Sequence, residues 1–285
     1  DAYNQTTNRL TSLRKTGHFT DKVDIIVSGG TWSFYPKRYQ RDFTRGIYNA
    51  LNFPISKKKS LAEAQLINET ATNRCIGLSF ETRPDHINEK ELKWLRELGC
   101  TKIEIGLQSL NNKVLEMNRR GHGITESQKA LQLIRDAGYK INVHMMPNLY
   151  GSTPEIDLAD MKELFDNPAY RPDWMKVYPC VVTPWTILKS YYEKGLYQNY
   201  NDSTLVNLLV EMTKLFPEYV RITRINRDIS ADTIISGCKI SNLRQVVEKK
   251  LAEQGISSRD IRSREIKDEK VQFKDLNLNV REFIA

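Results

Sequence analysis

Short apolar runs alternate with longer segments of mixed polarity along most of this chain. Runs of strand length lie at 23–27, 75–80, 102–106, 141–146, 175–182 and 219–225. Between them, apolar residues recur every three or four positions, the period of an amphipathic helix. The predicted helices are 4–16, 38–51, 60–73, 88–98, 124–137, 155–165 and 241–253. This repetition of strand, polar strand end and helix is typical of stacked βα units around a parallel sheet.

The segment 100–122 shows the clearest of these units. Ile103 and Ile105 alternate with polar neighbours, as in a strand, and the run breaks into Gln108 and Ser109 where an aliphatic end would be expected. In parallel α/β folds the carboxyl ends of the strands face the ligand. These residues taken alone leave one alternative open, a surface strand with a frayed polar end.

Two other predicted strand ends carry residues suited to ligand binding. Gly29 and Gly30 follow the strand 23–27, and paired glycines let backbone N–H groups approach a ligand closely. An ordinary βα turn would have the same glycines. The strand 75–80 leads into Glu81 and further charged residues, which are costly to bury unless they are paired or bind a ligand.

Composition narrows the class of protein. The chain has 285 residues, of which 40% are hydrophobic, so it can bury one large core or two modest ones. No window approaches the roughly 18 to 20 apolar residues of a membrane span, and we expect no membrane association. The net charge of +8 allows a nucleic-acid partner. Four widely spaced cysteines predict a reduced, cytoplasmic protein.

Several motifs together match one known family in order and approximate spacing. They are SGGT at 28–31, CIGLSFETRPD at 75–85, KIEIGLQS at 102–109, NRRGH at 118–122, HMMPN at 144–148, KVYPCVV at 176–182, RINRDI at 224–229 and RDIRSREI at 259–266. Over about residues 3–268 the chain resembles the radical S-adenosylmethionine (SAM) domain of the tRNA uridine acetyltransferases, the family of the catalytic subunit of Elongator. The resemblance implies an α/β fold, a partial (β/α)6 TIM-like barrel of the radical SAM type with a C-terminal extension. We expect the barrel at 1–185 and a helical and strand extension at 186–285.

The resemblance also implies a cofactor site. Such enzymes need backbone groups for the amino group of SAM, a positive charge for its carboxylate and polar groups at its nucleoside. Gly29, Gly30 and Thr31 match the loop that takes the amino group. The other expected cofactor contacts are Glu81, Gln108 and Ser109 at the nucleoside and Arg120 at the carboxylate.

The family's reaction implies further site residues. Its members use acetyl-CoA and SAM to form a carboxymethyl-type group on carbon 5 of wobble uridine 34. His144 and Lys176, at the next strand ends, are the expected catalytic residues, although Lys176 could instead pair with Glu81 or Glu104 as a structural residue. The expected partner is a tRNA anticodon stem-loop, and a homodimer or other Elongator-type subunits are further expected partners. The expected RNA-binding residues are Arg221, Arg224, Arg227, Arg259, Arg262 and Arg264.

Two parts of the family pattern have no counterpart in this sequence. The three cysteines that hold the family's [4Fe-4S] cluster would precede residue 1, and none of the four cysteines present can replace them by spacing. We therefore expect no metal ligands among these residues. The acetyltransferase domain that follows the radical SAM domain is also missing, so we expect a fragment that binds tRNA weakly and is inactive alone.

Three other functions compete with this interpretation. One is a different radical SAM enzyme of the porphyrinogen-oxidase type, which shares the paired glycines and the GxQS pattern. Another is an RNA-binding scaffold that kept the barrel and lost the cluster. The third is an ordinary metabolic TIM-like barrel in which Lys176 forms a Schiff base.

Overall fold

The computed structural model describes residues 1–54, 59–226, 229–266, 270–280 and 282. These residues form two compact units. Unit 1 comprises residues 1–106 and 132–141, and unit 2 comprises 107–131 and 142–285. Arg227, one of the expected RNA-binding residues, lies outside the described residues.

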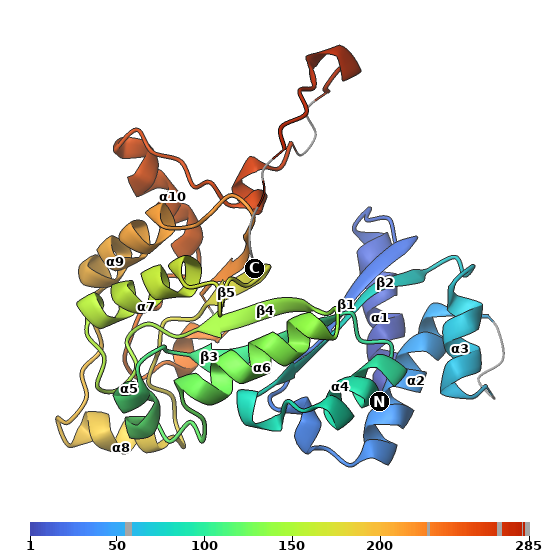
Figure 1. Cartoon of the computed structure of the whole chain (residues 1–285), viewed down its shortest axis with the longest axis horizontal. Helices are drawn as coiled ribbons and strands as arrows, with labels where there is room; N and C mark the ends of the chain where they lie inside the picture. The colour runs from blue at the N-terminus through green and yellow to red at the C-terminus, as the bar shows by residue number, and fades with distance from the viewer. Residues whose placement is uncertain (55–58, 227–228, 267–269, 281, 283–285) are drawn as a thin grey trace. The chain divides into compact units, whose positions relative to one another are not determined.

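Unit 1 consists of parallel strands with helices, as the alternating pattern predicts. Its strands lie in the order β1-β2-β3, and both neighbouring pairs are parallel. Among its helices, α1 packs on α2 and α2 on α3 (Figure 1). Its elements are α1 (Ala2–Lys15), β1 (Lys22–Val27), η1 (Trp32–Phe34), α2 (Lys37–Leu51), α3 (Leu61–Asn68), β2 (Arg74–Thr82), η2 (Pro84–His86), α4 (Glu89–Glu97) and most of β3 (Lys102–Gln108).

The helix 60–73 expected from the sequence is too long. Helix α3 begins at a capping box, in which Ser60 and Glu63 satisfy each other's backbone N–H groups, and it ends at Asn68. The Asn68 amide donates to the carbonyl of Asn73, and its oxygen accepts from the N–H of Cys75 at 2.7 Å. These bonds turn the chain toward β2, so residues 69–73 cannot continue the helix.

Strand β3 is buried along its whole length, so the alternative of a surface strand is wrong. Ile103 and Ile105 are fully buried, as their pattern predicts, but Lys102 is only 4% exposed and Glu104 is 0% exposed. The Lys102 ammonium pairs with Asp24 of β1 at 3.2 Å, which offsets the cost of burying its charge. Local alternation could not reveal this partner, because it lies 78 positions away in sequence.

Unit 2 holds the remaining strands in the order β4-β5-β6, again with parallel pairs. Helix α9 packs against both α7 and α10 (Figure 1). Two elements, α6 (Ile124–Asp136) and β4 (Lys140–Met145), contribute residues to both units. The others are α5 (Asn112–Met117), α7 (Pro154–Asp166), β5 (Trp174–Val177), α8 (Ile187–Glu193), α9 (Asp202–Lys214), β6 (Arg221–Ile225), η3 (Ala231–Thr233), α10 (Leu243–Glu253), η4 (Ile261–Arg264) and η5 (Phe273–Asp275).

The strand expected at 175–182 is shorter in the structure. Strand β5 ends at Val177, and Pro179, which has no N–H to donate, follows soon after. The neighbouring N–H groups of Tyr178 and Cys180 donate to carbonyls of residues 145 and 147 at 2.8 Å each. The chain therefore stays close to the end of β4 without forming a regular strand.

Within the described part of the chain, no helix combines the length and the apolar character needed to cross a membrane.

Candidate functional site

The loop after β1 in unit 1 has the conformation expected of the paired glycines. Gly29 and Gly30 have φ angles of +137° and +101°, which residues with a side chain rarely adopt. A Cβ at either position would meet no atom within 4 Å, so the backbone angles, and not crowding, call for glycine. The loop exposes its backbone groups, as a loop that takes a ligand's polar group would have to.

The register of β1 and β2 places this loop beside Glu81. Val27 pairs with Phe80, so the glycine loop begins level with the half-buried Glu81. A hydroxyl contact of 2.8 Å between Ser33 and Thr82 then joins the chain after Thr31 to the end of β2. Unit 1 thus brings together four of the expected cofactor residues: Gly29, Gly30, Thr31 and Glu81.

Gln108, at the end of β3, combines an unusual backbone with an unused acceptor. Its φ is +73°, and its carbonyl accepts from the N–H of Met146 at 2.8 Å. The side chain is 8% exposed, and its Oε1 atom is buried without a hydrogen-bond partner among the described residues. A buried acceptor without a donor costs roughly 1–3 kcal/mol, so Gln108 is suited to a donor on a bound ligand.

Ser109, in contrast, already uses its hydroxyl within the protein. Its Oγ donates to the Asp160 carboxylate at 2.5 Å and accepts from the N–H of Asn111 at 3.1 Å. The N–H of Leu110 donates to the same Asp160 oxygen at 2.8 Å. Asp160 of α7 therefore holds the chain immediately after Gln108.

Arg120 lies in a loop that folds back to β3. The His122 ring approaches the carbonyl of Arg120 at 3.2 Å and that of Leu107 at 3.4 Å, through different nitrogens. A neutral ring donates one of these two bonds, and a protonated ring donates both. His122 thus ties the half-buried Arg120 to the end of the strand that carries Gln108.

The two expected catalytic residues lie side by side in unit 2. His144 of β4 pairs in register with Lys176 of β5, and Lys176 pairs with Arg224 of β6. His144 is 3% exposed and Lys176 is 7% exposed, and the His144 ring meets Tyr178 edge-on at 5.5 Å. The register of the sheet therefore places an imidazole, a primary amine and a guanidinium on neighbouring strands at the same height.

A second carboxylate of α7 holds the chain after β4. Asp157 accepts hydrogen bonds from the N–H of Asn148 at 2.7 Å, from the Ser152 hydroxyl at 2.6 Å and from the Tyr200 hydroxyl at 2.9 Å. Asn148 has a φ of +68°. Burial raises the pKa of Asp157 to about 6, although its three donors favour the charged form.

The raised pKa predicts a stability that depends on pH. The folded chain binds the Asp157 proton more tightly than the unfolded chain does. The protonated Asp157 therefore adds to the free energy of unfolding below pH 3.8, the ordinary pKa, and this contribution is lost as pH rises through about 6. The loss should amount to roughly 3 kcal/mol. We expect Asp157→Asn to flatten the plot of unfolding free energy against pH, measured by urea titration. The matched variant Asp275→Asn, in an exposed segment, should keep the wild-type slope, and an unchanged slope in Asp157→Asn would contradict the prediction.

A basic pocket of about 750 Å³ lies in unit 2 at the carboxyl end of β6. Its cationic lining residues are Arg224, Lys239, Arg244 and Arg262. Thr223, Ser230, Ser241 and Asn226 add hydroxyl and amide groups. The described residues that line it include no carboxylate. Such a surface is suited to an anion with several oxygen acceptors, such as a phosphodiester.

Close packing of its cations adds to the pocket's positive character. Burial and the neighbouring charge of Arg262 lower the pKa of Arg244. Arg244 donates to the carbonyl of Ile222 at 2.6 Å, and Arg262 donates to that of Thr223 at 2.6 Å. Both guanidiniums are thus fixed along β6. Arg244 also pairs with Glu248 at 3.5 Å, which balances part of its charge.

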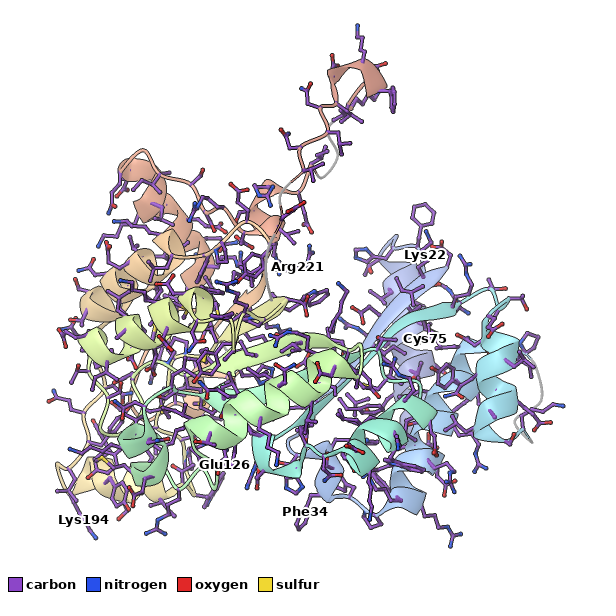
Figure 2. All side chains as sticks on the ribbon, viewed as in Figure 1. Lys22, Phe34, Cys75, Glu126, Lys194 and Arg221 are labelled. Atoms are coloured by element: carbon purple, nitrogen blue, oxygen red, sulfur yellow. The ribbon has the colours of Figure 1, made fainter. Side chains whose placement is uncertain are left out.

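The expected RNA-binding arginines separate into two groups. Arg224 and Arg262 line the basic pocket. Arg221, which begins β6 (Figure 2), pairs with Glu265 and lies 5.6 Å from the Trp174 ring. The exposed Arg264 donates to the carbonyls of Glu218 and of Arg259, itself exposed.

Sequence reasoning missed several residues of these sites. Asp157 and Asp160 sit three positions apart in a helix with apolar neighbours, a spacing that puts both on one face, and this was a usable signal. Lys239 and Arg244 belong to no cluster of basic residues in the sequence. Their place in the pocket depends on the fold, so the sequence alone carries no signal for them.

None of the four cysteines, all in the described ranges, forms a disulfide, and three of them are buried. Burial raises the pKa of Cys75 to about 11 and that of Cys100 to about 12, so both stay protonated at neutral pH. In the part of the chain that the structure describes, no three His, Cys, Asp or Glu side chains are grouped as metal ligands.

Comparison with known proteins identifies the family of this fold. The model of the radical SAM superfamily matches residues 12–164, and that of the Radical_SAM C-terminal domain matches residues 172–253. The tRNA uridine(34) acetyltransferase of Methanocaldococcus infernus is 41% identical, covering 90% of this chain and 48% of that protein. Elongator complex protein 3 of Homo sapiens is 36% identical, covering 90% of this chain and 46% of that protein. The chain spans about half the length of these curated relatives.

A solved structure agrees with these matches. The archaeal Elp3 of Methanocaldococcus infernus with an N-terminal deletion aligns with a TM-score of 0.90 and 41% identity, covering 93% of this chain and 62% of that chain. The likeness confirms the predicted partial barrel of the radical SAM type and the resemblance drawn from the motifs. Because the superfamily model covers more than half of its length, this chain belongs to the radical SAM superfamily.

Proposed function

We propose that this chain is the radical SAM portion of a tRNA-modifying acetyltransferase, which uses acetyl-CoA and SAM to form a carboxymethyl-type group on wobble uridine 34. The main support is the 41% identity, over 90% of the chain, to a protein named tRNA uridine(34) acetyltransferase. We expect the complete protein to modify wobble uridine in vitro. Because the chain spans 48% of that relative, binding of SAM and of RNA are the parts of this proposal that the chain itself can test.

The cofactor half of the proposal is supported by residues suited to SAM. The loop at Gly29 and Gly30 exposes backbone groups for the amino group, and Arg120 supplies a positive charge for the carboxylate. The unused Oε1 of Gln108 would accept a hydrogen bond from the nucleoside. When bound, SAM supplies the adenosyl group from which the superfamily's radical chemistry starts.

The [4Fe-4S] cluster expected of this superfamily does not fit the described residues. The four cysteines lie in separate parts of the chain, and no set of three grouped ligands is found in the described ranges. We therefore assign no reaction step to a cluster held by these residues.

The residues of β4 and β5 have a proposed role at the acetyl group or the uridine. His144 could hold or release a proton at a ring nitrogen, and the neighbouring Lys176 ammonium would stabilise negative charge that develops on an oxygen. Their burial excludes most water from this level of the sheet.

The basic pocket is our proposed contact with the anticodon stem-loop. A phosphodiester there would meet the guanidiniums of Arg224, Arg244 and Arg262 and the ammonium of Lys239. The pocket lies at the carboxyl end of β6 and is lined by Arg224. On the neighbouring strand β5, Lys176 pairs in register with Arg224. RNA held in the pocket would therefore lie beside the proposed catalytic residues of unit 2. We also propose a cytoplasmic location, in keeping with four cysteines that form no disulfide within the described ranges.

This proposal predicts a salt-dependent loss of RNA affinity in Lys239→Glu. Because one phosphate contact is lost and a like charge is added, we expect affinity for an anticodon stem-loop RNA to fall about tenfold or more at low salt. The slope of log affinity against log salt should decrease by about one. Fluorescence anisotropy across a salt series measures both quantities.

The matched control is Lys194→Glu, the same change at an exposed lysine that does not line the pocket (Figure 2). It changes the net charge by the same amount as Lys239→Glu. We expect it to lower RNA affinity less than about threefold and to keep the wild-type slope of log affinity against log salt. Equal losses in the two variants would mean that only overall charge matters, and the pocket would no longer be the proposed RNA contact.

A further inference from the structure

Asp160, which no sequence motif singled out, is placed to control the proposed cofactor acceptor. It lies in the middle of α7 and is 8% exposed, and its carboxylate accepts hydrogen bonds from the two residues directly after Gln108. One of its oxygens accepts from both the Ser109 hydroxyl and the Leu110 N–H. A buried carboxylate is costly unless such bonds stabilise it, so this arrangement fixes the local backbone.

The backbone that Asp160 fixes is a strained one. Gln108 has a φ of +73°, which a residue with a side chain adopts only where its surroundings enforce it. Three constraints act on this residue within unit 2. The Ser109 N–H donates to the Leu107 carbonyl at 3.0 Å and so closes a tight turn across Gln108. Met146 donates to the Gln108 carbonyl at 2.8 Å on one side, and Asp160 holds Ser109 and Leu110 on the other.

Gln108 and Asp160 also line a common small cavity. Its volume is about 10 Å³, and Met146 and Met161 complete much of the wall. A space of this size is at the lower limit for one water molecule. Asp160 and Gln108 therefore face the same small gap in the packing of unit 2.

We propose that Asp160 is a positioning residue, which presents the Gln108 carboxamide to SAM by holding the left-handed backbone turn at the end of β3. The proposal rests on the proposed function, because it assumes that Gln108 accepts a hydrogen bond from SAM. Asp160 itself does not touch the cofactor and acts through Ser109 and Leu110.

A double-mutant cycle on SAM binding tests this role. Calorimetry on the 285-residue chain would compare the wild type with Gln108→Ala, Asp160→Asn and the double variant. We expect each single variant to bind SAM about tenfold more weakly. Gln108→Ala removes the acceptor itself, and Asp160→Asn replaces two charge-assisted hydrogen bonds, to Ser109 and Leu110, by weaker neutral ones. The double variant should also be about tenfold weaker and not about a hundredfold, because Asp160 acts only through Gln108.

Two further variants keep the test independent of folding. Asp166→Asn makes the same change at an exposed position of α7 and should bind SAM as the wild type does. If Asp160→Asn does not fold, Ser109→Ala replaces it in the cycle, since it removes one hydroxyl and keeps the bond from Leu110 to Asp160. Its loss of affinity should be smaller, about threefold, and likewise absent in the Gln108→Ala background.

The outcomes separate this inference from the proposed function. Losses that multiply in the double variant would show a general structural or electrostatic effect and overturn the positioning role. Wild-type affinity in Asp160→Asn or its substitute, with weakened binding in Gln108→Ala, would overturn only the inference. Wild-type affinity in Gln108→Ala would overturn the inference together with the assignment of Gln108 as a SAM contact. No binding of SAM by the wild type would overturn the cofactor half of the proposed function.

Discussion

Replacing Asp260 with alanine is expected to destabilise the fold by roughly 3 to 5 kcal/mol, a large part of a typical domain's stability. Asp260 is 1% exposed and accepts from the backbone N–H groups of Ile222 and Arg262 and from the hydroxyls of Ser258 and Ser263. Alanine would leave these donors without their acceptor. Thermal unfolding followed by circular dichroism should show a midpoint lowered by roughly 10 °C.

The same substitution should also affect the basic pocket. Asp260 joins η4 to β6, and η4 carries Arg262. RNA affinity should therefore fall even at temperatures where Asp260→Ala is folded. The control is Asp275→Ala, which removes an exposed carboxylate from the C-terminal segment and should shift the midpoint by less than about 2 °C. If Asp260→Ala also lowered the unfolding midpoint by less than about 2 °C, the four hydrogen bonds to Asp260 would not stabilise the fold as we expect.

Phe80→Ala is expected to cost roughly 3 to 5 kcal/mol in unit 1. Phe80 is 0% exposed and stacks on Trp32, with ring centroids 4.6 Å apart and planes inclined by 13°. Alanine would lose this stacking and leave a cavity that the β1–β2 pair cannot fill without moving. Urea titration should show a lower midpoint with a similar dependence on denaturant.

Phe273→Ala provides the comparison for Phe80. Its side chain is 90% exposed, so the same truncation removes almost no buried surface and should change stability by less than about 0.5 kcal/mol. Similar effects of the two variants would mean that Phe80 packs less tightly than its burial indicates. One residue, Thr31, separates the loop at Gly29 and Gly30 from Trp32, so we also expect Phe80→Ala to weaken SAM binding.

The order of the elements could be predicted from the sequence because each strand is a compact apolar run. Val23 to Val27 and Ile103 to Ile105 show this most clearly, and both lie in strands. The ends of elements were harder to predict. Asn68 ends its helix through bonds to residues five and seven positions away, and Pro179 shortens the expected strand. In both cases a specific hydrogen-bonding requirement overrides a favourable local pattern.

The proposed site shows a similar limit. Motifs pointed to Gln108 and Ser109 together, yet the structure separates their roles, because only the Gln108 acceptor has no partner among the described residues. The partner that occupies Ser109 lies 51 positions away, so no local pattern could indicate it. The basic pocket was only partly foreseen, since Arg224 was expected but Lys239 and Arg244 were not. Sequence gives residue types, whereas pairing across elements decides which of them remain available.

The spacing of the two carboxylates on α7 has a consequence for how this chain can change in evolution. Asp157 and Asp160 hold the segments after β4 and β3 from one helix face. Inserting or deleting one residue between them would rotate one carboxylate by about 100° relative to the other, so only one of the two segments could remain attached. Related chains should therefore vary freely at the exposed Ala159 but show no insertions or deletions from 157 to 160.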